Sequence, residues 1–113
     1  MHEMSLCENV IQIVEDAAKA ESFNSVIGIW IEVGSLAGVE ISALEFCFDI
    51  IRQNSIAENA TLHIIEVPAL AWCKACKKNV EIQQRFSPCP LCVGHQLEFT
   101  SGDEMKIKEL EVA

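Results

Sequence analysis

The sequence has no apolar run long enough to cross a lipid bilayer, and its first residues lack the basic region and apolar stretch of a signal peptide. These absences predict a soluble protein of the cytoplasm. Repeats, low-complexity tracts and long linkers are also missing. With 113 residues, half of them hydrophobic, the chain suits one domain, or one domain that carries a small insert.

Basic residues are scarce, because 8 Lys and Arg stand against 17 Asp and Glu and give a formal net charge of −9. A surface this acidic repels the phosphate backbone of nucleic acids and attracts cations or basic protein surfaces. The imbalance is uneven, since residues 69–102 hold four basic and only two acidic side chains. We therefore expect neither a nucleic acid nor a membrane as a partner.

Four of the six cysteines form two Cys-x-x-Cys pairs, Cys73 with Cys76 and Cys89 with Cys92. Each two-residue gap lets both sulfurs of a pair turn toward one centre, and two pairs complete the four-thiolate shell of a structural zinc site. A closed shell has no position for water or a substrate. The pattern predicts a structural Zn(II) ion and a protein that is not an enzyme.

The cysteine pairs have one alternative interpretation, and the residues next to them and the two remaining cysteines have simple ones. A dithiol redox centre is the alternative for the pairs, but it normally uses one Cys-x-x-Cys at the start of a helix. We expect Gly94 to adopt the backbone conformation that lets amides donate to sulfur. His95 is an alternative ligand, but with four thiolates available we expect it to be a bystander. Cys7 and Cys47 fall in helical patterns and are expected to be small buried side chains.

The hydrophobic pattern predicts the order helix, strand, helix, strand, cysteine-rich insert, strand. Each helix is expected to start at a capping box, in which Ser5 or Ser42 is followed three residues later by glutamate. The first helix should end near Ala20 and the second near Gln53 or Asn54, and the dense apolar residues of the second predict that it is well buried. The predicted strands are Val26–Val33, Thr61–Val67 and Met105–Val112.

A single return strand after the insert indicates one α+β unit with the insert as a satellite. Pro68 and Gly102 mark the boundaries, where the charge also changes. We therefore predict one domain formed by residues 1–68 plus 103–113 and a zinc-binding domain over residues 69–102. The insert has too few apolar residues to fold alone, so zinc should supply its folding energy, on the order of 10 kcal/mol.

The second residue is a histidine, and a bulky residue at this position is expected to block removal of Met1. The free amine of Met1, the backbone nitrogen of His2 and its imidazole can then form fused chelate rings around one ion. Such a nitrogen-rich, near-planar donor set suits Ni(II) or Cu(II) better than zinc or magnesium. The alternative is a chance histidine at a disordered terminus, although the helix start just downstream would hold His2 in place.

Several segments then occur together in one order. They are Met1-His2-Glu3, Ile31-Glu-Val-Gly-Ser-Leu with Val39-Glu40, Leu44-Glu-Phe-Cys-Phe, and the two cysteine pairs. In this combination the chain resembles the HypA/HybF family of hydrogenase maturation factors along essentially its full length. The Met-His-Glu start combined with paired cysteines is specific, whereas either feature alone is not.

The resemblance implies a nickel metallochaperone that assists nickel insertion into the large subunit of nickel-iron hydrogenase. It implies an α+β fold of two helices packed on a three-stranded sheet, with a zinc-ribbon-like domain inserted before the last strand. Nickel would be held by the imidazole of His2 with backbone nitrogens at the N-terminus, from Met1 to Glu3. The implied partners are a nickel-delivery GTPase accessory protein and the hydrogenase large-subunit precursor, and the protein would be a monomer or a homodimer.

One departure from the family concerns the residues directly after the cysteine pairs. Some members carry histidines there, where this chain has Lys77 and Val93. Control of the zinc site by such histidines is therefore in doubt, with only His95 nearby. The alternatives to a metallochaperone are a zinc-ribbon module that binds nucleic acid or protein, and a thiol oxidoreductase.

Overall fold

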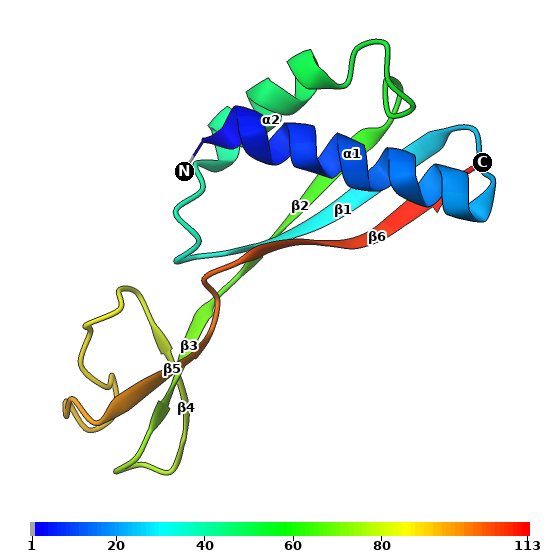
Figure 1. Cartoon of the computed structure of the whole chain (residues 1–113). Coiled ribbons are helices and arrows are strands. Elements are labelled where there is room, and N and C mark those ends of the chain that lie inside the picture. Colours follow the sequence, from blue (N-terminus) through cyan, green and yellow to red (C-terminus); the bar gives the residue numbers. More distant parts are fainter. Residues whose placement is uncertain (1) are drawn as a thin grey trace. The chain divides into compact units, whose positions relative to one another are not determined.

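A computed structural model of the chain describes residues 2–113. Its helices are α1 (Glu3–Glu21) and α2 (Ile41–Ile51). Its strands are β1 (Val26–Gly34), β2 (Thr61–Val67), β3 (Ala69–Cys73), β4 (Lys78–Ile82), β5 (Leu97–Ser101) and β6 (Met105–Val112). The predicted order of elements is confirmed, and the insert contributes β3, β4 and β5 (Figure 1). Over the described residues, neither helix is long and apolar enough to cross a membrane.

The chain forms two compact units. The first contains the residues up to Ile31, Val39–Ile65 and Ile107–Ala113, and the second contains Glu32–Gly38 and Glu66–Lys106. The second unit therefore includes the whole cysteine-rich segment together with the loop after β1 and the adjoining strand ends.

A three-stranded sheet in the order β2-β1-β6 carries both helices on one face (Figure 1). Strands β1 and β2 are parallel, because backbone hydrogen bonds join Val26 to Ile56 just before β2 and Ser35 to Val67 at its end. Their connection runs through α2, as a parallel pair requires a crossover. Strand β6 returns antiparallel, with the amide of Ala113 bonded to the carbonyl of Ser25. The α+β class with two helices on a three-stranded sheet is confirmed.

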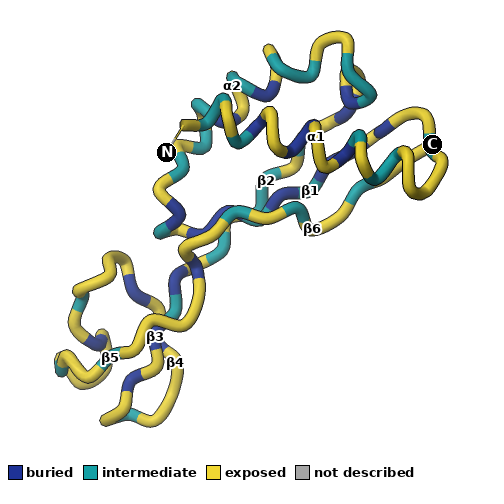
Figure 2. Tube along the Cα trace, viewed as in Figure 1, coloured by how far each residue is buried: buried dark blue, intermediate teal, exposed yellow. Residues whose placement is uncertain are grey.

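The core of this first unit lies between the sheet and one stripe of each helix (Figure 2). The buried residues of α1 recur at helical spacing, and β1 alternates between buried and half-buried residues from Ile29 to Val33. These residues are Cys7, Val10, Ile11 and Val14 on α1, Leu44 and Phe48 on α2, and Ile29 and Ile31 on β1.

The prediction that α2 is well buried is wrong. Only Leu44 and Phe48 of this helix are buried, whereas the side chain of Phe46 is 67% exposed and that of Ile50 is 44% exposed. The helix contacts the sheet and α1 on one side, so its outer side chains face solvent whatever their polarity. Apolar density alone does not reveal how many neighbours a helix has.

Both predicted capping boxes are also wrong, because each helix begins before the serine. The N-cap residue of α1 is His2, whose side chain makes no cap hydrogen bond. At α2 the N-cap is Glu40, whose carboxylate accepts from the amide of Ser42 at 3.2 Å and from its hydroxyl at 2.6 Å. The hydroxyl of Ser42, followed by its amide, lowers the pKa of the Glu40 carboxyl. Ser42 thus donates to the cap instead of forming it.

The second unit is built on an antiparallel sheet in the order β4-β3-β5. Its buried cluster consists of Ala69, Ala71, Cys73, Val80, Ile82 and Cys89. Two of these six residues are cysteines of the predicted metal site, and two are alanines. This core is small, so its stability depends on what the cysteines bind.

Candidate metal centre

The four paired cysteines meet at one place in the second unit. Cys73 is the last residue of β3 and Cys76 lies in the turn before β4, while Cys89 and Cys92 lie between β4 and β5. Their sulfur atoms all lie within 4.8 Å of one another. The Sγ atoms of Cys73 and Cys92 are 3.7 Å apart, and those of Cys76 and Cys89 are 3.9 Å apart.

These distances fit a tetrahedral metal ion. Zinc binds thiolate sulfur at about 2.3 Å, and a regular tetrahedron with that radius has edges of about 3.8 Å. Four sulfurs already close the shell, and the metal-ligand cluster found among residues 2–113 contains these cysteines alone. His95 is exposed and does not belong to it. The residues present therefore fit a closed structural zinc site.

The two pairs form turns of the same kind. In the first turn the amide of Cys76 donates to the sulfur of Cys73 at 3.4 Å, and the amide of Lys77 donates to the carbonyl of Cys73 at 2.7 Å. In the second turn the amide of Leu91 donates to the sulfur of Cys89 at 3.4 Å, and the amide of Val93 donates to the carbonyl of that cysteine at 2.8 Å. Amides that point at sulfur stabilise the thiolate form.

Ionisation of the thiols differs within the cluster. The backbone amides of Cys92 and Leu91 lower the pKa of Cys89 to about 7. A hydrogen bond with Cys92, and then burial, raises the pKa of Cys76 to about 12. Cys89 therefore ionises more readily than Cys76, and a metal ion has to displace the proton of Cys76 when it binds.

The left-handed residue of the second turn is Val93, with φ of 62°, and not Gly94 as predicted. Lys77, with φ of 57°, occupies the matching position of the first turn. Both residues directly follow a cysteine pair, because the turn reverses at that point. Gly94 instead accepts a hydrogen bond at its carbonyl from the amide of Cys89, at 2.8 Å.

We predict that Val93→Gly increases the zinc affinity of the protein. A β-branched residue at positive φ is strained by roughly 1–3 kcal/mol, and glycine relieves this strain while making the unfolded chain more flexible. The Val93 side chain is 70% exposed, so its loss removes little packing. We expect a net gain of about 1 kcal/mol, or about fivefold in affinity, in competition with a chelator.

Lys77→Gly is the matched control, because lysine is not β-branched and is less strained at the same position. Its gain should be smaller than that of Val93→Gly. An equal or larger gain for Lys77→Gly would show that branching at Val93 does not strain the turn.

The predicted nickel-binding residues lie at the start of α1. His2 is exposed, has an extended backbone with φ of −89° and ψ of 100°, and accepts at its carbonyl from the amide of Leu6. Glu3 is the first helical residue, and its carboxylate accepts from the amide of Glu40 at 3.3 Å. Met1, the third predicted ligand, lies outside the described residues.

The hydrogen bond between Glu3 and Glu40 was not predicted from the sequence. It joins residues 37 positions apart and fastens the first turn of α1 to the N-cap of α2. Both N-termini meet only because the two helices run in the same direction on the sheet. The segment Val39-Glu40 was noted as part of a resemblance, but no local pattern indicated this contact.

Cys7 and Cys47 remain separate from both sites. Cys7 is 1% exposed and its thiol donates to the carbonyl of Leu44 at 3.4 Å. Burial, with smaller contributions from Cys47 and Glu3, raises the pKa of Cys7 to about 11. Cys7 is therefore an unreactive packing residue, as predicted, whereas Cys47 is only half-buried and not fully buried as predicted.

The fold and the cysteine cluster together define a small α+β protein with a four-thiolate metal site. A family model described as "Hydrogenase/urease nickel incorporation, metallochaperone, hypA" matches residues 1–112. The chain belongs to this family, HypA, and the resemblance drawn from its motifs is confirmed.

Curated relatives match over nearly the whole chain. The hydrogenase maturation factor HypA of Rhodopseudomonas palustris strain BisA53 is 51% identical over 112 residues, which is 99% of each chain. Hydrogenase maturation factor HypA 2 of Bradyrhizobium diazoefficiens is 50% identical, again over 99% of each chain. The family is thus one of metallochaperones and maturation factors, not one of the alternative modules considered above.

Solved structures share the fold. The solution structure of the Ni metallochaperone HypA from Helicobacter pylori matches with a TM-score of 0.72 at 24% identity, covering 99% of this chain and 97% of that one. A second solution structure, titled "Solution structure of HypA protein", matches with a TM-score of 0.74 at 23% identity and covers 100% of this chain and 97% of that one.

Proposed function

We propose that the protein binds Ni(II) at its N-terminus and assists nickel insertion into the large subunit of nickel-iron hydrogenase. Membership of the HypA family is the observation that carries this proposal. The proposed mechanism is transfer of the ion without covalent chemistry. A labile terminal site releases its ion when a partner offers better ligands.

The proposed nickel ligands are the amine of Met1, the backbone nitrogen and imidazole of His2, and the backbone nitrogen of Glu3. The first amides of a helix have no acceptor within the helix, and in the described chain no side chain caps α1. Exposed amides of this kind can lose their protons to a metal ion. Two deprotonated amides balance the charge of Ni(II), so the neutral centre is compatible with the positive end of the helix dipole.

Glu3 and Glu40 support this site as positioning residues. The hydrogen bond from the Glu40 amide to the Glu3 carboxylate, at 3.3 Å, restrains the first turn of α1. Glu40 is itself restrained by its two hydrogen bonds with Ser42. The backbone nitrogen of Glu3 is therefore held by two helices, which reduces the entropy lost when it binds an ion.

In this proposal the four-cysteine site holds a structural Zn(II) ion. The ion would complete the small core of the second unit through Cys73, Cys76, Cys89 and Cys92. We assign nickel binding to a domain of residues 1–68 plus 103–113 and zinc binding to residues 69–102. A cytoplasmic location is part of the proposal, because thiolate ligands need a reducing compartment.

The proposed partners are a nickel-delivery GTPase accessory protein and the large-subunit precursor of the hydrogenase. They would act on a monomer or a homodimer of this chain. The relatives named as hydrogenase maturation factors support this assignment.

We predict that His2→Ala weakens Ni(II) binding by at least about 100-fold. Loss of a residue that only hydrogen-bonds to a metal ligand already lowers metal affinity by about 10–100-fold, and His2 is itself a proposed ligand. Isothermal titration of Ni(II) into the zinc-loaded protein measures the affinity, and zinc analysis should still give one ion per chain. His95→Ala, at another exposed histidine, should leave nickel binding unchanged. Equal nickel affinities for the native protein and His2→Ala would contradict the assignment.

The same titration at several pH values tests the amide ligands. Protons compete with Ni(II) for the amide nitrogens, so the affinity should fall as the pH is lowered. A parallel titration with Cu(II) is expected to give tighter binding at the same residues, since copper precedes nickel in affinity for nitrogen ligands.

A further inference from the structure

Helix α2 leaves an apolar ridge uncovered in the described structure. Phe46 is 67% exposed and Ile50 is 44% exposed, and the two lie one turn apart on the side opposite to the buried Leu44 and Phe48. Large apolar side chains that gather on one helix face are characteristic of surfaces that bind another protein.

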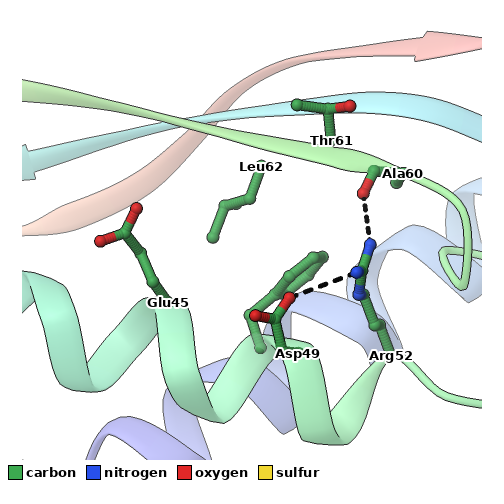
Figure 3. A pocket seen from close by; sticks show the side chains of 7 residues that line it. Glu45, Asp49, Arg52, Ala60, Thr61 and Leu62 are labelled. Carbon is green, nitrogen blue, oxygen red and sulfur yellow. Dashed lines mark hydrogen bonds and ion pairs between the residues drawn. The ribbon is translucent and has the colours of Figure 1, made fainter.

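A pocket of about 280 Å³ lies beside this ridge, between α2 and β2 (Figure 3). Its floor includes Phe48 and Leu62, and α2 contributes the carboxylates of Glu45 and Asp49 at its rim. The guanidinium of Arg52 donates to the carbonyl of Ala60 at 2.8 Å and pairs with Asp49 at 3.3 Å. The pocket thus combines an apolar floor with an acidic rim.

The charges at this pocket do not balance. Arg52 neutralises one carboxylate, but the carboxylate of Glu45 makes no hydrogen bond or ion pair with any residue from 2 to 113 in the structure. One further positive charge would neutralise the rim. The Phe48 and Leu62 floor would take the aliphatic stem of a lysine or arginine that supplies this charge.

The acidic and apolar rows are adjacent on α2. Glu45 and Asp49 form one row, and Phe46 and Ile50 form the next, because residues four apart stack along a helix. We call these four residues the α2 docking surface. Its apolar row can contact apolar side chains of a partner, and its neighbouring acidic row can pair with basic side chains.

The charge of the whole first unit narrows the choice of partner. This unit contains eleven acidic and three basic residues, a net charge of −8, whereas the second unit has six acidic and five basic residues. Two α2 docking surfaces would repel each other, which disfavours a symmetric contact between copies of this chain. Anionic lipids and nucleic acids are disfavoured for the same reason.

We infer that the α2 docking surface binds a basic amphipathic segment of another protein. Apolar side chains of the segment would cover Phe46 and Ile50, and one lysine or arginine would enter the pocket beside Glu45. This is the helix-face mode of recognition, in which apolar residues give affinity and charges give orientation. The inference goes beyond the proposed function, because it does not depend on nickel binding at His2.

The test uses a synthetic 18-residue amphipathic peptide with leucines on one face and lysines beside them, labelled for fluorescence anisotropy. The zinc-loaded native protein should bind it, and Phe46→Ser and Glu45→Lys should each weaken binding at least tenfold. A peptide with glutamate in place of every lysine should not bind. Both substitutions are at exposed positions, and circular dichroism checks that the variants stay folded.

Two variants provide matched controls. Ile13→Ser removes another exposed apolar side chain, 55% exposed on α1, and Glu58→Lys makes the same charge change at an exposed position after α2. Both should retain native affinity. If Glu58→Lys weakens binding as much as Glu45→Lys, the peptide binds only through electrostatic attraction to the net charge of the protein, and the inference fails. It also fails if the basic peptide does not bind, or if sedimentation shows a native dimer that Phe46→Ser dissociates, since a second copy would then cover the surface.

Discussion

Cys89→Ser is expected to abolish stoichiometric zinc binding and to unfold the second unit. Cys89 is 1% exposed, has a thiol whose pKa is lowered by backbone amides, and belongs to the buried cluster of six residues. A hydroxyl is a poor ligand for zinc compared with a thiolate. The metal contributes folding energy on the order of 10 kcal/mol in small structural zinc sites, which exceeds what this core can supply alone.

Amide NMR spectra and zinc analysis measure this effect together. The resonances of residues 69–101 should collapse to unfolded positions in Cys89→Ser, and treatment of the native protein with a chelator should produce the same change. Cys47→Ser is the control, because Cys47 is half-buried on α2 and outside the cluster. A folded second unit without bound metal would contradict the structural role of zinc.

The strands around the insert were predictable because proline and glycine mark their ends. Strands β2 and β6 have the predicted bounds, Thr61–Val67 and Met105–Val112, and Pro68 ends the first of them. Alternation of apolar and polar residues is a local property, and so is a break caused by proline. The clustering of the four cysteines was predictable for a similar reason, since the two-residue spacing constrains each pair locally.

Some errors concern local backbone and cap geometry, and others concern contacts that join distant residues. The serine patterns predicted the helix starts, but Glu40 reaches Ser42 with a longer side chain and moves the start of α2 to Ile41. The Glu3 contact depends on the parallel arrangement of α1 and α2, which appears only once both helices lie on the sheet. The exposure of Phe46 likewise depends on which side of α2 has a neighbour.

The strands of the insert could not be predicted from sequence patterns. Strands β3, β4 and β5 have five residues each, and the pairing of Ala69 with Ile82 depends on a sheet that the cysteine cluster helps to close. Short strands are ambiguous by periodicity. The nickel ligands were proposed from the chemistry of an N-terminal histidine and from the family, and the structure adds an exposed His2 at a helix start without a side-chain cap.

Gly102→Ala is expected to destabilise the second unit by more than about 3 kcal/mol, because two penalties act at one residue. The φ of Gly102 is 106°, a conformation that costs an alanine roughly 1–3 kcal/mol. An added Cβ would also lie 2.8 Å from the carbonyl oxygen of Pro68 and would overlap the Cα of Ala69. These are backbone atoms, so no side-chain rotation relieves the clash, and overpacking adds typically 1–3 kcal/mol.

The backbone around Gly102 has little freedom to move away from the added group. Its carbonyl accepts from the amide of Leu36 at 2.9 Å, and the amide of Gly34 donates to the carbonyl of Glu104 at 3.0 Å. A Cβ on Gly34 would in turn lie 2.9 Å from the Cα of Gly102. A shift that accommodates alanine would therefore break these backbone hydrogen bonds, each worth about 1 kcal/mol.

Gly38→Ala separates the two penalties. Gly38 also has positive φ, 72°, but an added Cβ would meet nothing within 4 Å. This control should lose only about 1 kcal/mol, from backbone strain alone. Urea unfolding of the zinc-loaded proteins, followed by the fluorescence of Trp72 in a Trp30→Phe background, measures both losses. Equal losses of stability would mean that the strands around Gly102 relax. A much larger loss for Gly102→Ala would show that close backbone packing at Gly102 stabilises the second unit.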